Sequence, residues 1–166
     1  MKIQTLIKNP KFLFILIILL AVIIRLFVLL SIGTNKFIFQ GDEPNYYNVA
    51  KNIYEGKGPV ENYIWNLWFN HKTIMHLDDA YPSLFSYLLA GVFYLFKESI
   101  FVSKLVSFIF SILTIILIYF IGKSLYNKKV GLLSMFFLSI NPTHIIYSIS
   151  TMREIVFSFF IFIFIL

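Results

Sequence analysis

The sequence is short of charge and has no cysteine. Of its 166 residues, 13% are charged and only eight are acidic, whereas 59% are hydrophobic and 19% are aromatic, with a mean hydropathy of +0.83. A soluble globule of this size needs more polar surface, so the composition excludes that class. Without cysteine there is neither a disulfide framework nor a thiolate nucleophile. The sequence therefore predicts a polytopic membrane protein.

Several functional signatures are also missing. There is no glycine-rich phosphate loop, and no metal-ligand spacing of the HExxH or CxxC kind. The three histidines, His71, His76 and His144, lack ligand spacing as well, so we predict no cofactor and find no support for a divalent metal. The net charge of +6 comes from basic residues at the ends of apolar runs, which is typical of membrane orientation signals and not of nucleic-acid binding.

Long apolar runs are what the sequence does contain. About 20 helical residues cross a hydrocarbon core of roughly 30 Å, so spans are predicted at about 12–32, 100–121 and 130–148. A fourth run, 155–166, is too short to cross, and we expect an incomplete span and the N-terminal part of a longer protein. A signal peptide is the less favoured interpretation of the first run, which is too long and contains Arg25.

The segment 33–99 is predicted to be a large external loop with two surface helices. A helix is predicted at about 43–55, because Asp42 can serve as its N-cap, Pro44 suits its first turn, and Gly56 and Gly58-Pro59 supply a stop. A second helix, at about 82–96, is apolar but too short for a typical span, and its large apolar residues recur at helical spacing. We predict that it lies along the membrane surface. The aromatic residues Tyr63, Trp65, Trp68 and Phe69 resemble an interfacial belt.

The positive-inside rule favours this topology. If 82–96 does not cross, all eight acidic residues lie on one side and the lysines near the N-terminus and at 123–129 lie on the other. We therefore predict a multi-pass protein of the plasma membrane, with a cytoplasmic N-terminus and its active site on the external face. The lysines concerned are Lys2, Lys8, Lys11, Lys123, Lys128 and Lys129.

Asp42 and Glu43 are the leading candidates for chemistry. Charges beside a membrane span are costly unless something uses them. The predicted topology brings this pair to one membrane level with Lys104, Arg153 and Glu154. A carboxylate beside cations suits group transfer from a lipid phosphate, in which Asp42 accepts a proton from the attacking hydroxyl and Lys104 or Arg153 neutralises the departing phosphate.

The chain resembles the GT-C fold glycosyltransferases, specifically the protein O-mannosyltransferase and aminoarabinose-transferase group. The resemblance covers nearly the whole chain as scattered positions. Its motifs are Arg25 inside the first span, Asp42-Glu43-Pro44-Asn45-Tyr46-Tyr47 with Ala50, Tyr81-Pro82-Ser83-Leu84, Tyr94-Leu95-Phe96, Ser103-Lys104-Leu105-Val106-Ser107, Gly122-Lys123-Ser124-Leu125-Tyr126, Asn141-Pro142 and Ser150-Thr151-Met152-Arg153-Glu154.

This resemblance implies an all-α transmembrane helical bundle with juxtamembrane helices in its large first external loop. It implies an inverting transfer of a sugar from a polyprenyl-phosphate donor to the hydroxyl of an acceptor protein, lipid or glycan, with Asp42 as the base and Glu43 supporting it. The family's basic residue at the outer start of the second span is Lys104 here, and its acid in the second external loop is matched by Glu154. The predicted substrate-binding set is Lys104, Arg153, Glu154, Arg25, Tyr46 and Tyr47.

Other interpretations of these residues stay open. Asp42 could serve only as a helix cap, Glu43 as a first-turn charge on the helix dipole, and Lys104 and Arg153 as side chains that reach the membrane interface. For Arg25 we favour a partner inside the bundle or a donor phosphate.

The mannosyltransferases carry consecutive prolines after a histidine, where this chain has His76-Leu77-Asp78. The alternative function is a non-enzymatic membrane subunit or an inactive truncated remnant.

Overall fold

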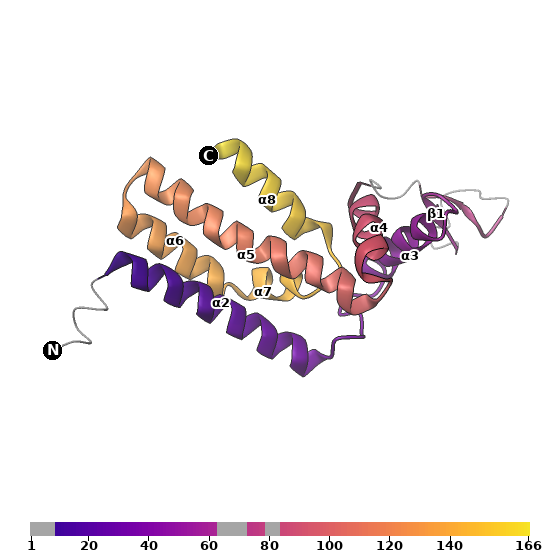
Figure 1. Cartoon of the computed structure of the whole chain (residues 1–166), viewed down its shortest axis with the longest axis horizontal. Coiled ribbons are helices and arrows are strands. Elements are labelled where there is room, and N and C mark those ends of the chain that lie inside the picture. Colours follow the sequence, from indigo (N-terminus) through magenta and orange to yellow (C-terminus); the bar gives the residue numbers. More distant parts are fainter. Residues whose placement is uncertain (1–8, 63–72, 79–83) are drawn as a thin grey trace. The chain divides into compact units, whose positions relative to one another are not determined.

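A computed structural model describes residues 9–62, 73–78 and 84–166, and most of these residues are helical (Figure 1). Within these residues the only strands form a short antiparallel ribbon, in which Val60 pairs with Leu77 and Glu61 with His76. The predicted all-α membrane fold is confirmed. The elements are α2 (Pro10–Ile32), α3 (Asp42–Tyr54), β1 (Val60–Glu61), β2 (His76–Leu77), α4 (Leu84–Phe96), α5 (Ile100–Leu125), α6 (Lys128–Ile140), α7 (Pro142–Ser148) and α8 (Arg153–Ile165).

The chain divides into two compact units. The helical unit contains the described residues up to Gly33, together with Ser107–Ile149 and Arg153–Leu166. The loop unit contains the described residues of Thr34–Val106, together with Ser150–Met152. Two predictions lie outside the described residues, namely the aromatic belt at Tyr63 to Phe69 and the start of the second surface helix at Pro82.

The helical unit holds the helices that are suited to a membrane. By length and composition α2 and α5 can each cross a bilayer, and α6 with α7 makes a third span if the bent pair is counted as one. Figure 1 shows α2, α5 and α6 side by side. Their shared core is built from Ile17 and Ala21 of α2, Ile115 of α5 and Met135 of α6. On the opposite face of α2, large apolar side chains are exposed, as lipid-facing residues are: Ile23, Phe27 and Leu30.

A bend of 64° separates α6 from α7, where the sequence predicts one span at 130–148. Pro142 has no N–H and cannot continue the hydrogen-bond ladder of α6. Asn141 ends α6 with an N–H that donates to the Leu138 carbonyl at 3.4 Å, and its side chain caps α7 by accepting from the His144 N–H at 2.9 Å. The Asn-Pro pair therefore both ends one helix and starts the next.

Two glycines bring α5 and α6 into backbone contact. A β-carbon at Gly131 would lie 2.6 Å from the Tyr119 carbonyl oxygen, and one at Gly122 would lie 2.9 Å from the Gly131 α-carbon. Only glycine permits such an approach. Asn127 makes the turn between the helices, because its side chain accepts from the N–H groups of Lys129 and Val130 at the start of α6.

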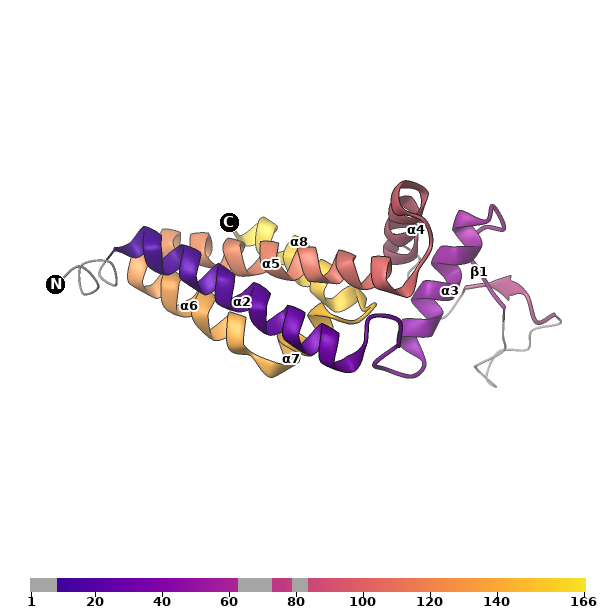
Figure 2. The same cartoon turned by 60° about the horizontal axis from the view of Figure 1, so that its bottom comes forward.

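The loop unit is centred on the packing of α3 against α4 (Figure 2). Tyr46 of α3 stacks edge-on against Phe85 of α4, with ring centres 5.3 Å apart, and Phe93 of α4 is fully buried. The other face of α4 leaves Leu84 and Leu95 exposed, at 80% and 77%. This two-sided character is typical of a helix at a membrane surface, and that location stays a prediction.

Candidate active site

The predicted base lies at the first position of α3. Gly41 is the N-cap residue, with φ at +97°, and its carbonyl accepts from the Asn45 N–H at 3.1 Å. A positive φ is readily adopted by glycine. Asp42 follows as the first helical residue and is half-buried. The prediction that Asp42 is the N-cap is therefore wrong, because Gly41 takes that position. A carboxylate in this first turn faces the positive end of the helix dipole.

Glu43 is fully buried and accepts hydrogen bonds from three backbone N–H groups. Its Oε2 accepts from the N–H of Ile38 and, at 2.8 Å, from the N–H of Phe39. Its Oε1 accepts from the N–H of Thr151, which lies 108 positions further along the chain. Glu43 thus holds together two segments of the loop unit that the sequence places far apart.

The first turns of α5 meet the same two segments. Ser103 and Thr151 are both buried, and their hydroxyl oxygens lie 2.7 Å apart in a hydrogen bond. Lys104 is also fully buried, and its ammonium group donates to the Lys36 carbonyl. Glu43 is a charged neighbour of Lys104. The structure therefore does not place Lys104 as an exposed interfacial cation, although a role in phosphate binding stays a prediction.

The two tyrosines after Glu43 make contacts inside the loop unit. Tyr46 is 1% exposed in the packing of α3 on α4. The Tyr47 hydroxyl donates to Glu98, which also pairs with Lys51 at 3.3 Å. Burial, and then the bond to Glu98, raises the pKa of the Tyr47 hydroxyl above its ordinary value. Substrate contacts for both tyrosines stay predictions.

Two residues of this arrangement were missed by the predicted set. Ser103 and Thr151 connect α5 to the segment between α7 and α8. Both stand within motifs that the resemblance singles out, beside Lys104 and two positions before Arg153. The available signal was the repetition of small hydroxyl residues next to charged ones, because hydroxyls placed beside buried charges commonly join their hydrogen-bond network.

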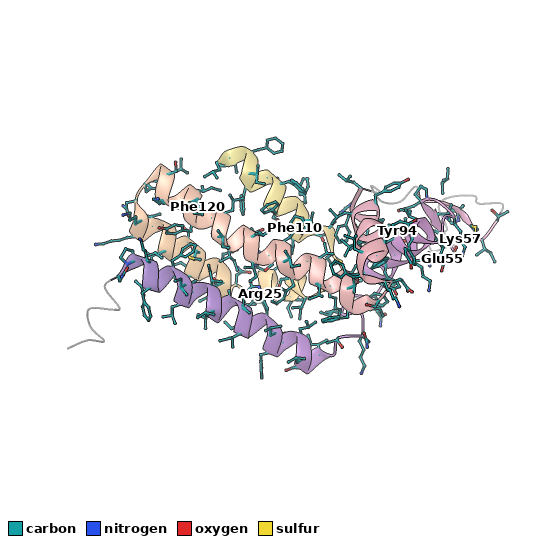
Figure 3. The ribbon with its side chains drawn as sticks, viewed as in Figure 1. Arg25, Glu55, Lys57, Tyr94, Phe110 and Phe120 are labelled. Carbon is teal, nitrogen blue, oxygen red and sulfur yellow. The ribbon has the colours of Figure 1, made fainter. Side chains whose placement is uncertain are left out.

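Arg25 occupies the interior of the helical unit (Figure 3) and is fully buried. Its Nε donates to the Ser111 hydroxyl at 2.7 Å, and its Nη1 donates to the Ala21 and Ser139 carbonyls, both at 3.1 Å. Its Nη2 bonds the His144 ring at 2.7 Å. Among the described residues no carboxylate pairs with it. These contacts supply a partner inside the bundle, whereas contact with a donor phosphate stays a prediction.

Arg153 and Glu154 begin α8 in the helical unit, and the Glu154 carbonyl accepts from the Ser158 hydroxyl at 2.7 Å. Asp42, Glu43 and Lys104 belong to the loop unit. The structure thus brings Glu43 and Lys104 together within one unit. The predicted meeting of all five charges at one membrane level stays a prediction, because Arg153 and Glu154 belong to the other unit.

A second polar cluster, absent from the predictions, lies where the β-ribbon meets α3. Glu61 is 1% exposed, and its Oε2 lies 3.5 Å from the Nε2 of His76, its partner across the ribbon. Burial, followed by the neighbouring carboxyl of Asp78, raises the pKa of Glu61 to about 7. Asn52 of α3 anchors the ribbon by donating to the Val60 carbonyl at 2.7 Å.

The ribbon is expected to loosen as the pH rises. The folded pKa of Glu61 lies above its ordinary value of 4.5, so the folded state holds this proton more tightly than the unfolded chain does. The stabilisation is complete below about pH 4.5 and is lost as the pH rises through 7. The Asp78 N–H donates to the Pro59 carbonyl at 2.9 Å. After correction for the intrinsic exchange rate, this N–H should be less protected from hydrogen exchange at about pH 8 than at about pH 5. Glu61→Gln should flatten this dependence; equal pH dependence in the variant would contradict the assignment.

In the described ranges 9–62, 73–78 and 84–166, no three histidine or acidic residues gather in a way that could hold a metal ion. What the geometry offers instead is a half-buried carboxylate, Asp42, next to a buried network that contains a lysine and two hydroxyls. Such a set can accept a proton and place a positive charge, which are the two tasks of hydroxyl-directed group transfer.

These observations define the class as an all-α membrane protein with a cluster of charged residues in its loop unit. The chain belongs to the dolichyl-phosphate-mannose-protein mannosyltransferase family, whose model matches residues 80–166, just over half of the chain. The predicted kinship with GT-C mannosyltransferases is confirmed. Neither the curated proteins nor the solved structures yield a match.

Family membership supports glycosyltransferase activity and a membrane location for this chain. The matched residues include the described helices α4 to α8, and with them Lys104, Arg153 and Glu154. Asp42 and Glu43 precede the matched region. Their roles therefore rest on the resemblance of their own motif and on the contacts described above.

Proposed function

We propose that this chain is part of a membrane glycosyltransferase that moves a sugar from a polyprenyl-phosphate donor to an acceptor hydroxyl, with inversion at the anomeric carbon. The observation that carries the proposal is the family match over residues 80–166, because the family's name specifies a lipid-phosphate-linked sugar and a protein acceptor. A lipid-linked donor also suits an enzyme whose helices are built to cross a membrane, since both partners are then confined to one surface.

Asp42 is proposed as the base. It removes the proton of the acceptor hydroxyl while that oxygen forms its bond to the anomeric carbon. The bond between the anomeric carbon and the phosphate oxygen breaks, and its electron pair leaves with the polyprenyl phosphate. The proposed function assigns the neutralisation of that phosphate to Lys104 or Arg153. Attack from the face opposite the leaving group inverts the configuration.

The active site is proposed to face outward from the plasma membrane, with the N-terminus in the cytoplasm. Lys123, Lys128 and Lys129 lie at the turn between α5 and α6, at the opposite end of α5 from Lys104. Basic residues favour the cytoplasmic side. If α5 crosses the membrane, its first turns and the acidic loop unit then belong to the external face.

A donor test decides the proposal. The full-length protein, reconstituted in liposomes, would be supplied with mannose, glucose or aminoarabinose on polyprenyl phosphate, and separately with the nucleotide forms of these sugars. We expect transfer to envelope protein, lipid or glycan only from a polyprenyl-phosphate donor. Transfer from the nucleotide sugars alone would overturn the donor assignment. Absence of transfer from every lipid-linked donor would favour the non-enzymatic alternative.

A further inference from the structure

We propose that Glu43 is a positioning residue, which holds the start of α3 and the connection between α7 and α8 in register without exchanging a proton with substrate. This inference rests on the proposed function, because it concerns the geometry of the same site. The two neighbouring carboxylates then have different roles, Asp42 as the base and Glu43 as the residue that positions it. Asp42 is half-buried at the first helical position, whereas Glu43 is fully buried.

The contacts of Glu43 leave its carboxylate little freedom to meet a substrate. Both of its oxygens accept backbone N–H groups, one from Thr151 and the other from Ile38 and Phe39. A carboxylate only accepts, and hydrogen bonds to a charged acceptor are among the stronger ones in proteins. If Glu43 turned toward an acceptor hydroxyl, the N–H groups of Ile38, Phe39 and Thr151 would each lose its carboxylate as a hydrogen-bond acceptor.

What Glu43 holds is the framework of the candidate site. Ile38 and Phe39 precede α3, so their attachment to Glu43 fixes how the chain enters the helix that carries Asp42. Thr151 is fixed from the other oxygen and hydrogen-bonds the Ser103 hydroxyl at 2.7 Å.

The same framework reaches the buried lysine. Ser103 directly precedes Lys104. The Lys104 ammonium donates to the backbone carbonyl of Lys36, in the segment that leads to Ile38. The contacts of Glu43 therefore help to fix the position of Asp42 relative to Lys104. A displacement of about 1 Å at a catalytic group is enough to cost roughly a hundredfold in rate.

The side-chain amide in Glu43→Gln can replace only one of the two acceptor oxygens of Glu43. Glutamine offers one carbonyl oxygen and one NH₂ group, which donates. In either orientation the NH₂ faces backbone donors, so one of the two segments loses its acceptor while the other keeps it. Aspartate retains both acceptor oxygens on a side chain that is one methylene shorter. Glu43→Asp should therefore keep part of the kcat that is lost in Glu43→Gln.

The experiment measures turnover and hydrogen exchange on the full-length protein. We expect Glu43→Gln to lower kcat by roughly a hundredfold, with the shape of the pH–rate profile unchanged, and Glu43→Asp to recover at least part of that loss. Exchange at the Thr151 amide, or at those of Ile38 and Phe39, should rise in Glu43→Gln. Glu55→Gln is the matched control, because Glu55 is the C-cap residue of α3 and pairs with Lys57 at the surface. It should leave both measurements unchanged.

The outcomes separate this inference from the proposed function. Loss of one limb of the pH–rate profile in Glu43→Gln would make Glu43 a proton-transfer group and overturn the inference. Wild-type kcat, or unchanged exchange at all three amides, would also overturn it. If the full-length protein transfers no sugar from any lipid-linked donor, the proposed function fails, whereas the exchange result still reports whether Glu43 holds the two segments.

Discussion

Asp42→Asn is expected to lower sugar transfer from a polyprenyl-phosphate donor by about 10²- to 10⁴-fold, which is the usual contribution of a general base. Asparagine has nearly the shape of aspartate, and Gly41 keeps the cap of α3, so the helix should still begin at residue 42. The amide cannot accept the proton of the attacking hydroxyl. The loss should therefore appear in kcat and leave the fold intact.

The measurement compares initial rates in liposomes for wild type, Asp42→Asn and the surface control Glu55→Gln. Thermal unfolding in detergent should give the same midpoint for all three proteins, which would assign the lost activity to chemistry. Turnover of Asp42→Asn at the rate of wild type would remove Asp42 from the mechanism. A shared loss of rate and stability would instead assign Asp42 a structural role.

Arg25→Met is expected to destabilise the helical unit strongly. Methionine fills a similar length without donors, so the Ser111 hydroxyl, the Ser139 carbonyl and the His144 ring each lose a hydrogen bond. An orphaned buried polar group costs about 1–3 kcal/mol, and three of them outweigh the gain from no longer burying a charge, so we expect a net loss of about 3 kcal/mol.

The position of Ser139 explains why the loss of Arg25 should lower the stability of the helical unit. It is the last but one residue of α6, where the helix ends before Pro142 and the terminal carbonyls have no partner within the helix. Arg25 donates to one of these carbonyls and places its positive charge at the C-terminal end of the helix dipole. Arg25 therefore stabilises the break itself.

Reversible unfolding in mixed detergent micelles would measure the loss. Arg25→Lys should fall between Arg25→Met and wild type, because an ammonium keeps the charge but lacks the planar fork that reaches several acceptors. Phe27→Leu is the control, since Phe27 is 70% exposed on the outer face of α2. If Arg25→Met proves as stable as wild type, the hydrogen bonds of Arg25 contribute nothing to the fold.

Local sequence patterns were enough to predict where most of the helices lie. The length of the apolar runs and the stop signal at Gly56 and Gly58 are properties of neighbouring residues, and α3 lies at Asp42–Tyr54 against the 43–55 expected. The bend at Asn141-Pro142 also carried a local signal, because a proline inside an apolar run interrupts the helix. The prediction of one continuous span at 130–148 takes no account of this signal.

The contacts of the candidate site could not be predicted in the same way. Glu43 reaches Thr151 and Arg25 reaches Ser139 across more than a hundred residues, and no periodicity specifies such pairs. The cluster of Glu61 and His76 depends on a ribbon only two residues long on each strand, which is too short to leave an alternating pattern. Identifying the charged residues was possible from the sequence, whereas assigning their partners needed the fold.

The glycine contact between α5 and α6 has a consequence for how this sequence can drift over evolution. Ile109 of α5 and Phe137 of α6 are exposed, and one bulky apolar residue there can replace another with little effect. Gly122 and Gly131 have no such freedom, because even a methyl group would meet backbone atoms that cannot turn aside. Substitution is therefore tolerated on the lipid-facing surfaces of the two helices, whereas the contact between them requires glycine at both positions.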